Sequence, residues 1–444
     1  MSGPELITLG CRLNIAESEA MRALAGQADD LVIVNSCAVT AEAVRETRKA
    51  IRRAHRARPD ARILVTGCAA QIEPETFAAM PEVTRVVGNA AKLTPASFHF
   101  PFPFGSSEVE TRCATHGAGP STSLGTNGNG NDRVQVSDIF TLQQTAPHMA
   151  AAFAEHTRAF VEVQNGCDHR CTFCIIPYGR GNSRSLPAGL VIDRIKALVD
   201  AGHGEIVLTG VDLTSYGPDL PGGPTLGHLA ERILRHVPGL RRLRLSSLDS
   251  VEIDDRLFDL LTGDERMMPH VHLSLQAGDD MILKRMKRRH SRAQAVALIE
   301  RLKARRPEIA IGADIIAGFP TEDEAMAANT LALIDDCDVV FGHVFPYSPR
   351  PGTPAARMPQ VDRATIRRRA LALREAAARR RASWLDGLIG SRQDMLVESD
   401  GHGGHAGNFA RVRLSPGSAG QQRGEILPVR VMAREQDMLI AEPA

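Results

Sequence analysis

Three cysteines lie close together in the middle of the chain, Cys167, Cys171 and Cys174, in a C-x3-C-x2-C pattern. Three thiolates at this spacing can bind three irons of a cubane iron–sulfur cluster and leave the fourth iron without a protein ligand. An iron with an open position can bind a substrate or a cofactor. Two other interpretations stay open. A zinc site usually needs a fourth Cys or His, and His169 lies inside the loop; a disulfide would leave one thiol over.

A second group of cysteines, Cys11, Cys37 and Cys68, is widely spaced in the sequence. Each follows a short apolar run that predicts a β-strand, at residues 6–9, 31–35 and 63–66. Helical patterns separate these runs, which indicates parallel strands, and the carboxyl ends of parallel strands meet at one edge of a sheet. We therefore expect the three thiols to converge on a second iron–sulfur site with one open iron. The alternative is that each Cys is a small buried hydrophobic residue.

Length and composition indicate a multidomain globular protein. A chain of 444 residues, 43% of them hydrophobic, is too long for one ordinary core. No apolar stretch approaches a membrane span and the N-terminus lacks a signal-peptide pattern, so we expect a cytoplasmic protein without membrane contact. In that reducing compartment the eight cysteines favour metal binding or catalysis over disulfides. Cys113 and Cys337 are assigned no role.

Four regions follow from the order of the patterns and describe an α/β multidomain fold. Residues 1–94 alternate short strands and helices, which is typical of a parallel α/β sheet domain. Residues 95–157 contain a tract rich in Gly, Ser, Thr and Asn, and we expect a flexible linker or insertion in which Phe140 docks on a domain. Residues 158–382 and 383–444 are the third and fourth regions.

The third region repeats a strand followed by a helix. Six apolar runs predict its strands: residues 160–164, 206–210, 242–246, 271–276, 309–316 and 339–345. Six such units indicate a partial (βα)6 barrel, whose chemistry is expected on the loops after the strands. The C-x3-C-x2-C motif follows the first strand directly and is therefore expected at the mouth of the barrel.

The fourth region predicts four short strands, at residues 393–399, 409–414, 424–431 and 437–441. Gly-rich turns join them, and a small antiparallel β-barrel fits this pattern. Arginines are frequent here and in the preceding helical stretch, residues 363–381, where they form either a solvated face or a phosphate-binding surface. Phe409 is the only aromatic residue in these strands, so contacts to a nucleic-acid backbone are favoured over base stacking.

These features resemble a known family. The cysteine motif at the head of a six-unit partial barrel is similar to the radical S-adenosylmethionine (SAM) superfamily. The stretches TLGCRLN (8–14), VNSC (34–37) and VTGC (65–68) resemble the methylthiotransferase domain, and VHLSLQAG (271–278), DIIAGFP (314–320) and FPYSPRPGT (345–353) are further matches. The C-terminal barrel resembles the TRAM module, a small RNA-binding domain. The resemblance covers nearly the whole chain except the linker.

The resemblance implies an enzyme that uses SAM and two [4Fe-4S] clusters. The catalytic cluster, which binds SAM and yields a 5′-deoxyadenosyl radical, would be held by Cys167, Cys171 and Cys174. An auxiliary cluster carrying the sulfur would be held by Cys11, Cys37 and Cys68. The net reaction replaces a carbon–hydrogen bond with carbon–SCH3, chemistry that needs a cofactor because the carbon is not activated.

Other cofactor contacts are expected at the ends of the barrel strands. The residues implied by the family pattern are Gly210, Ser246, Ser247 and Gln276. Arg180 and Arg184 follow the cysteine motif, and by their position they are expected to reach a substrate phosphate or the cofactor carboxylate.

The implied substrate is a tRNA. The TLGCRLN stretch is similar to the subgroup that adds a methylthio group to carbon 2 of N6-threonylcarbamoyladenosine next to the anticodon. The alternatives are isopentenyladenosine in tRNA and an aspartate of a ribosomal protein. The expected partners are the tRNA anticodon stem-loop and an external electron donor, and the protein is expected to be a monomer. An interpretation of another class is an RNA-binding protein with purely structural metal sites, which would be a colourless zinc protein.

Overall fold

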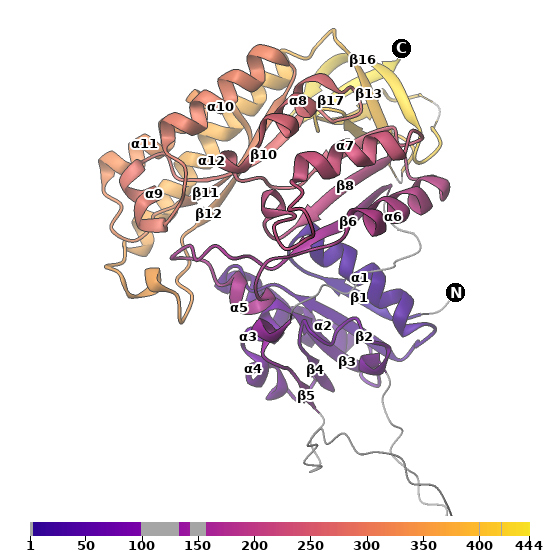
Figure 1. Ribbon diagram of the computed structural model, residues 1–444, viewed down its shortest axis with the longest axis vertical. Coiled ribbons are helices and arrows are strands. Elements are labelled where there is room, and N and C mark those ends of the chain that lie inside the picture. Colours follow the sequence, from indigo (N-terminus) through magenta and orange to yellow (C-terminus); the bar gives the residue numbers. More distant parts are fainter. Residues whose placement is uncertain (1–2, 99–132, 143–156, 399, 419) are drawn as a thin grey trace, which may run out of the picture.

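The computed structural model describes residues 3–98, 133–142, 157–398, 400–418 and 420–444. Three units are visible in Figure 1: a parallel sheet at the bottom, a larger barrel of strands and helices above it, and a small C-terminal barrel in yellow. This arrangement confirms the predicted α/β multidomain fold. Within the described ranges, no helix is long and apolar enough to cross a membrane.

The N-terminal unit is a five-stranded sheet in which every neighbouring pair is parallel, in the order β1-β2-β3-β4-β5. Its elements are β1 (Glu5–Thr8), α1 (Arg12–Ala25), β2 (Leu31–Ser36), α2 (Ala41–Ala57), β3 (Arg62–Gly67), α3 (Cys68–Ile72), α4 (Pro74–Ala78), β4 (Arg85–Val87), η1 (Pro95–Phe98), β5 (Val134–Gln135) and η2 (Ile139–Thr141). Strand β2 is buried along its whole length, as expected for an apolar run covered on both faces.

The end of the expected linker belongs to this unit. Residues 134–135 add strand β5 to the edge of the sheet beside β4. Ile139 is buried, and the Phe140 ring meets Tyr178 edge-on with centroids 6.1 Å apart. This segment therefore packs on the protein mainly through Ile139, whereas Phe140 stays 39% exposed beside Tyr178. The tract at 117–131 and Cys113 lie outside the described residues.

The central unit is a partial barrel with six parallel strands, as predicted. Two sheets, β7-β6-β8-β9 and β10-β11-β12, are joined by bridges from Leu243 to Met267 and from Leu248 to Leu273. The strands are β6 (Arg158–Asn165), β7 (Arg184–Ser185, antiparallel), β8 (Glu205–Gly210), β9 (Arg242–Leu245), β10 (His270–Gln276), β11 (Ala310–Ala317) and β12 (Val339–Pro346). The helices are α5 (Ile176–Arg180), α6 (Ala188–Asp200), η3 (Leu213–Ser215), α7 (Leu226–His236), η4 (Ser250–Glu252), α8 (Asp255–Gly263), α9 (Asp280–Met286), α10 (Arg292–Arg305), α11 (Glu324–Asp336), η5 (Pro354–Arg357) and α12 (Arg363–Asp386).

The two faces of the barrel strands differ sharply. Alternate residues of each strand, such as Ile311 and Ala313 in β11, belong to the large apolar core shared with the helices. Because side chains alternate along a strand, the residues between them line the inner face, and these are largely polar or charged. An inner face of this kind differs from the packed apolar interior of a complete barrel, and it is suited to a polar ligand.

The C-terminal unit is a closed five-stranded barrel in the order β13-β14-β15-β17-β16. Its strands are β13 (Arg392–Val397), β14 (Gly403–Ala406), β15 (Arg411–Leu414), β16 (Ile426–Glu435) and β17 (Met438–Pro443). Four pairs are antiparallel, as expected, whereas β15 and β17 are parallel. The short strand β14 was not predicted, because two of its four residues are glycine.

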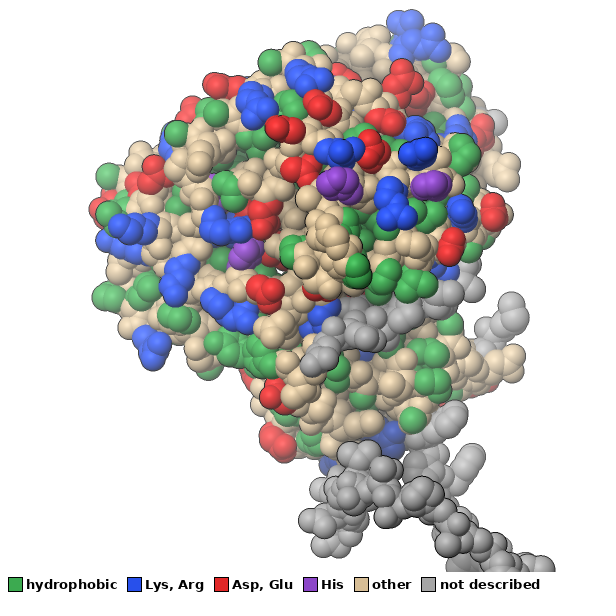
Figure 2. All heavy atoms as spheres, viewed as in Figure 1, with side chains coloured by type: hydrophobic (Ala, Val, Ile, Leu, Met, Phe, Trp, Pro, Cys, Tyr) green, Lys and Arg blue, Asp and Glu red, His purple; other side chains and the backbone are tan. Residues whose placement is uncertain are grey.

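Most arginines of helix α12 serve the fold. Arg368, Arg369, Arg374, Arg380 and Arg381 pair with acids or a carbonyl of the protein: Glu322, Glu324, Asp338, Asp437 and the Val344 oxygen. On the face shown in Figure 2, blue Lys and Arg side chains are scattered among red acidic ones over the upper part of the molecule. Helix α12 is thus mainly a packing helix rather than a continuous basic surface.

Candidate active site: two cysteine triads

The first triad lies in the loop after strand β6. Gly166 starts this loop with a positive φ of 75°, and a Cβ there would lie 1.8 Å from the Asn182 oxygen. Only glycine fits such a position. The Cys167 amide donates to the Gly181 oxygen at 3.1 Å, and the Cys174 amide donates to the Cys171 oxygen at 3.1 Å. The tight turn therefore folds the three motif cysteines into one compact loop.

The thiols of this loop lie among partly buried charges. Burial, followed by the nearby Asp212 carboxylate 3.4 Å from Cys167 Sγ, raises the pKa of the Cys167 thiol above its usual range. Burial likewise raises the pKa of Cys174 to about 12. Arg288 lies on the other side, with Nη1 3.7 Å from Cys171 Sγ. Thiols in this state hold their protons until a metal displaces them, since only the thiolate is a strong ligand.

His169 is already bonded elsewhere. Its Nε2 lies 3.0 Å from Asp212 Oδ2 and 3.6 Å from Glu252 Oε1. Hydrogen bonds to Asp212 and then Glu252 raise the pKa of His169 to about 10. In this arrangement, the Nε2 atom of His169 is paired with the two carboxylates rather than directed to a shared site with the motif cysteines.

The second triad gathers at the carboxyl edge of the N-terminal sheet. Cys11 caps helix α1, Cys37 follows β2, and Cys68 opens helix α3 immediately after β3. A Cβ on Gly10 would lie 3.1 Å from Cys37 Sγ. Burial raises the pKa of Cys37 to about 11, and the neighbouring Cys68 and Cys11 thiols add to the increase. The structure thus brings together three cysteines that are far apart in sequence.

Arg180 forms one wall of this second triad. Its Nε donates to Cys68 Sγ at 3.2 Å, and its Nη2 donates to Asn14 Oδ1 at 2.6 Å and to Glu17 Oε2 at 3.0 Å. Lys92 also pairs with Glu17, at 2.6 Å. The expectation that Arg180 reaches a substrate phosphate or cofactor carboxylate is therefore wrong, because its donors are used inside the protein.

Arg184 is buried as well. Its two terminal nitrogens donate to the backbone oxygens of Asn182 and Arg180, at 2.7 and 2.9 Å. These bonds brace the turn that carries Arg180. Arg184 therefore supports the loop, and its contact with a substrate phosphate or the cofactor carboxylate stays a prediction.

Helix α5 joins the two triads. It begins two residues after Cys174 and ends at Arg180, the residue that contacts Cys68. A Cβ on Gly179 would lie 3.1 Å from Cys68 Cβ, so glycine permits the close approach. Asn89 donates to the Gly179 oxygen at 2.5 Å. In Figure 1, α5 lies between the barrel and the N-terminal sheet. The two triads thus face a common region.

The four residues expected to contact a cofactor lie at strand ends of the barrel. Gly210 ends β8, where a Cβ would lie 2.9 Å from Gln164 Oε1. Ser246 is buried, and its Oγ has no hydrogen-bond partner among the described atoms. Ser247 is exposed, and Gln276 ends β10 with a positive φ of 66°. The unpartnered Ser246 hydroxyl is what a polar cofactor would satisfy.

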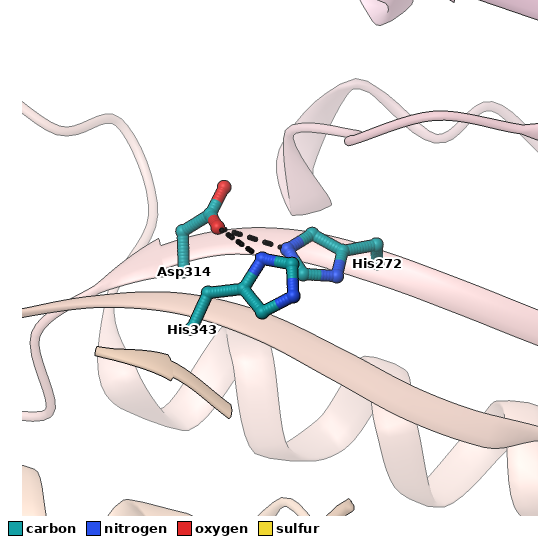
Figure 3. A group of neighbouring side chains, drawn as sticks. All are labelled: His272, Asp314 and His343. Carbon is teal, nitrogen blue, oxygen red and sulfur yellow. Dashed lines mark hydrogen bonds and ion pairs between the residues drawn. The ribbon is translucent and has the colours of Figure 1, made fainter. Parts of the chain in front are cut away.

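Sequence reasoning missed a polar cluster on the inner face, shown in Figure 3. Asp314 Oδ1 lies 3.0 Å from His272 Nε2 and 3.4 Å from His343 Nδ1. Asp314 and His343 are direct partners in the β11–β12 register. The three residues of this cluster come from strands β10, β11 and β12. The sequence feature that could have indicated the cluster is a charged residue, Asp314, within an otherwise apolar strand.

A second missed cluster lies where the three units meet. The Phe409 ring is surrounded by the guanidinium carbons of Arg244, Arg158 and Arg12, at 4.8, 5.4 and 5.6 Å from its centre. The His270 ring centre lies 5.1 Å away. Phe409 thus anchors the C-terminal barrel to the central one, and it is not a free platform for base stacking.

The fold and site together define a radical SAM enzyme. Residues 161–334 match the Radical SAM superfamily, and residues 5–88 match Uncharacterized protein family UPF0004. Among solved structures, the radical SAM methyltransferase TsrM of Kitasatospora setae has a similar fold, with a TM-score of 0.50 at 15% identity over 80% of this chain and 74% of that chain. Membership of the superfamily implies SAM and a [4Fe-4S] cluster.

Comparison with named relatives identifies the family within the radical SAM superfamily. The chain is 46% identical to the threonylcarbamoyladenosine tRNA methylthiotransferase MtaB of Rickettsia prowazekii, over 92% of this chain and 91% of the relative. It is 35% identical to the enzyme of the same name from Bacillus subtilis, over 80% and 76%. It is 32% identical to the tRNA-2-methylthio-N(6)-dimethylallyladenosine synthase of Ruegeria pomeroyi, over 96% and 100%. The chain belongs to the radical SAM methylthiotransferase family.

Proposed function

We propose that this methylthiotransferase acts on tRNA and adds a methylthio group to carbon 2 of N6-threonylcarbamoyladenosine next to the anticodon. The observation that carries the proposal is the pair of cysteine triads joined by helix α5. The proposed substrate is the one for which the relative from Rickettsia prowazekii is named, and that relative is 46% identical over 92% of this chain.

The two triads have the ligand sets for two [4Fe-4S] clusters. Their cysteines, Cys167, Cys171, Cys174, Cys11, Cys37 and Cys68, are all free thiols. Three thiolates per site match a cluster with one open iron. When loaded, the first cluster with SAM supplies a radical that abstracts hydrogen from an unactivated carbon, and the second supplies sulfur.

The surrounding residues would position and protect these groups. Asp212 and Arg288 lie against the first triad. Arg180 contacts Cys68 of the second triad, and Glu17 balances its charge. Gly210, Ser246, Ser247 and Gln276 are proposed to contact SAM, with the unpartnered Ser246 hydroxyl as the most direct support.

The C-terminal barrel is proposed to bind the tRNA backbone, as in the TRAM module it resembles. Arg411, Arg413 and Arg430 are exposed on its strands. Arginine contacts to phosphates supply sequence-independent affinity that falls with salt. Phe409 faces the central barrel, which leaves charge rather than stacking as the main interaction.

We further propose the domain division 1–94, 95–157, 158–382 and 383–444, a monomeric protein and an external electron donor. The described part of residues 95–157 belongs structurally to the N-terminal sheet through β5. The radical chemistry consumes an electron that the chain itself does not generate, which is the reason for an outside reductant.

The test is a nucleoside analysis of tRNA by mass spectrometry in a strain that lacks the protein. Loss of the 2-methylthio form with accumulation of unmodified threonylcarbamoyladenosine is expected, and the wild-type gene should restore it. A gene carrying Cys68→Ala should not restore it, whereas one carrying Cys337→Ala should. An unchanged profile in the deletion strain would refute the substrate.

Isopentenyladenosine in tRNA is the second candidate. A relative named for the dimethylallyladenosine reaction is 32% identical over 96% of this chain. The same nucleoside analysis separates the two substrates, because loss of the methylthio form of isopentenyladenosine would appear as a different mass.

A further inference from the structure

Among the described residues, Arg12 has an aromatic contact but no hydrogen-bond acceptor. It is the first residue of helix α1 and follows Cys11 directly. The guanidinium lies over the Phe409 ring, and it forms no hydrogen bond or ion pair with any residue the structure describes. A half-buried guanidinium normally finds an acceptor in the protein, because its five N–H donors lose part of their water. The donors of Arg12 are therefore available to a ligand.

The neighbouring arginines have their own acid. Arg158 and Arg244 both donate from Nε to Glu205 Oε1, at 2.8 and 2.9 Å. Arg12 lies around the same Phe409 ring as these two arginines, but it does not donate to Glu205. A guanidinium stays protonated in proteins. The guanidinium groups of Arg12, Arg158 and Arg244 gather around one Phe409 ring, so an added anion would relieve their repulsion.

Asp314 is the other acid near Arg12 on the inner face, and it is occupied. It lies within electrostatic reach of Arg12 but accepts from His272 and His343 instead, as Figure 3 shows. His343 is 60% exposed, and its Nε2 has no partner among the described residues. Two His and one Asp could form a metal site by composition. The positive charge of Arg12 beside them disfavours a cation and favours an anion.

We propose that Arg12 binds the carboxylate of the substrate's threonyl group, with His343 as a second donor. This inference rests on the proposed function. In adenine, carbons 2 and 6 flank the same ring nitrogen, so a base whose carbon 2 faces Cys11 carries its N6 substituent nearby. Arg12 is the chain neighbour of Cys11. The threonylcarbamoyl group carries a carboxylate and the isopentenyl group does not, so Arg12 would be the residue that distinguishes them.

The test uses cluster-loaded protein and two stem-loop RNAs that differ by one charge. One carries N6-threonylcarbamoyladenosine and the other its methyl ester. Wild-type protein should bind the acid about 10- to 100-fold more tightly, the range for a charged hydrogen-bonded pair. Arg12→Gln should bind both RNAs equally, and Arg12→Lys should keep part of the preference. Fluorescence anisotropy gives the Kd values, and methylthiolation assays give the matching ratio of kcat/KM.

The control is Arg53→Gln, which removes an exposed arginine of helix α2 and should keep the wild-type preference. An Arg12→Gln protein that still prefers the acid would overturn the inference. Equal weakening of both RNAs would also overturn it, because Arg12 would then bind a phosphate. Both RNAs are measured on the same preparation. A partial loss of the cluster next to Arg12 would therefore affect both Kd values alike and leave their ratio unchanged. Wild-type protein that modifies neither RNA would refute the proposed function, whereas equal modification of both would refute only this inference.

Discussion

Arg180 Nε lies 3.2 Å from Cys68 Sγ, although 112 positions separate the two residues in the chain. This contact joins the loop of the first cysteine triad to the second triad through the short helix α5. Because Arg180 is fully buried and also bonds Glu17, the contact fixes how the N-terminal sheet sits on the barrel. The geometry of the second triad therefore depends on a side chain that the segment after the first triad supplies.

Replacing Arg180 should damage the second triad selectively. Arg180→Ala removes one of the cations that pair with the buried Glu17 and should cost about 3 kcal/mol, the lower end for breaking a buried pair. We expect loss of methylthiolation while cleavage of SAM to 5′-deoxyadenosine continues, measured by chromatography of the reaction products. Arg53→Ala, an exposed change, is the control. Equal loss of both activities would contradict a selective role.

Glu205 is expected to hold the central and C-terminal barrels together. Burial would raise the pKa of Glu205, but Arg244, Arg158 and Arg242 outweigh it and lower the pKa well below the usual value. Arg242 and Arg244 also donate to the Asp394 and Gly407 oxygens of the C-terminal unit, at 2.7 and 3.1 Å.

The pH dependence of stability follows from this depressed pKa. The stabilisation is present above the unfolded pKa of about 4.3 and is lost as the pH falls toward the folded pKa. Glu205→Gln should lower the urea midpoint at pH 7 and flatten its fall below about pH 4.5. Fluorescence of Trp384, the only tryptophan and a neighbour of the C-terminal core, reports the transition. A variant with the wild-type profile would show that this ion cluster contributes little.

The exposed arginines of the C-terminal barrel should set the salt dependence of tRNA binding. Replacing Arg411 and Arg413 with Ala removes two cations that lie outside the barrel core. The slope of log K against log salt should become shallower by about 1.4 to 1.8 if each contacts one phosphate. Arg434→Ala is the control, since Arg434 pairs with Asp386 at 2.6 Å. An unchanged slope in the double variant would show that Arg411 and Arg413 do not contact the phosphates of the tRNA.

Much of this fold could be predicted because its strands are short apolar runs separated by helical patterns. The convergence of Cys11, Cys37 and Cys68 followed from the shared edge of parallel strands. The role of Arg180 could not be predicted, because its partners Asn14, Glu17 and Cys68 belong to another unit and lie more than a hundred positions away in the chain. The pairing of Asp314 with His343 likewise depends on strand register, which the spacing along the chain does not show.

Iron analysis of cysteine variants tests the central claim most directly. Wild-type protein, loaded anaerobically, should hold about eight irons, and replacing either triad with alanine should leave about four. The triple variant of Cys11, Cys37 and Cys68 should still cleave SAM, whereas that of Cys167, Cys171 and Cys174 should not. Cys337→Ala, which changes a buried cysteine outside both triads, should keep the wild-type iron content. Wild-type iron content in the Cys11, Cys37 and Cys68 variant would contradict a second cluster.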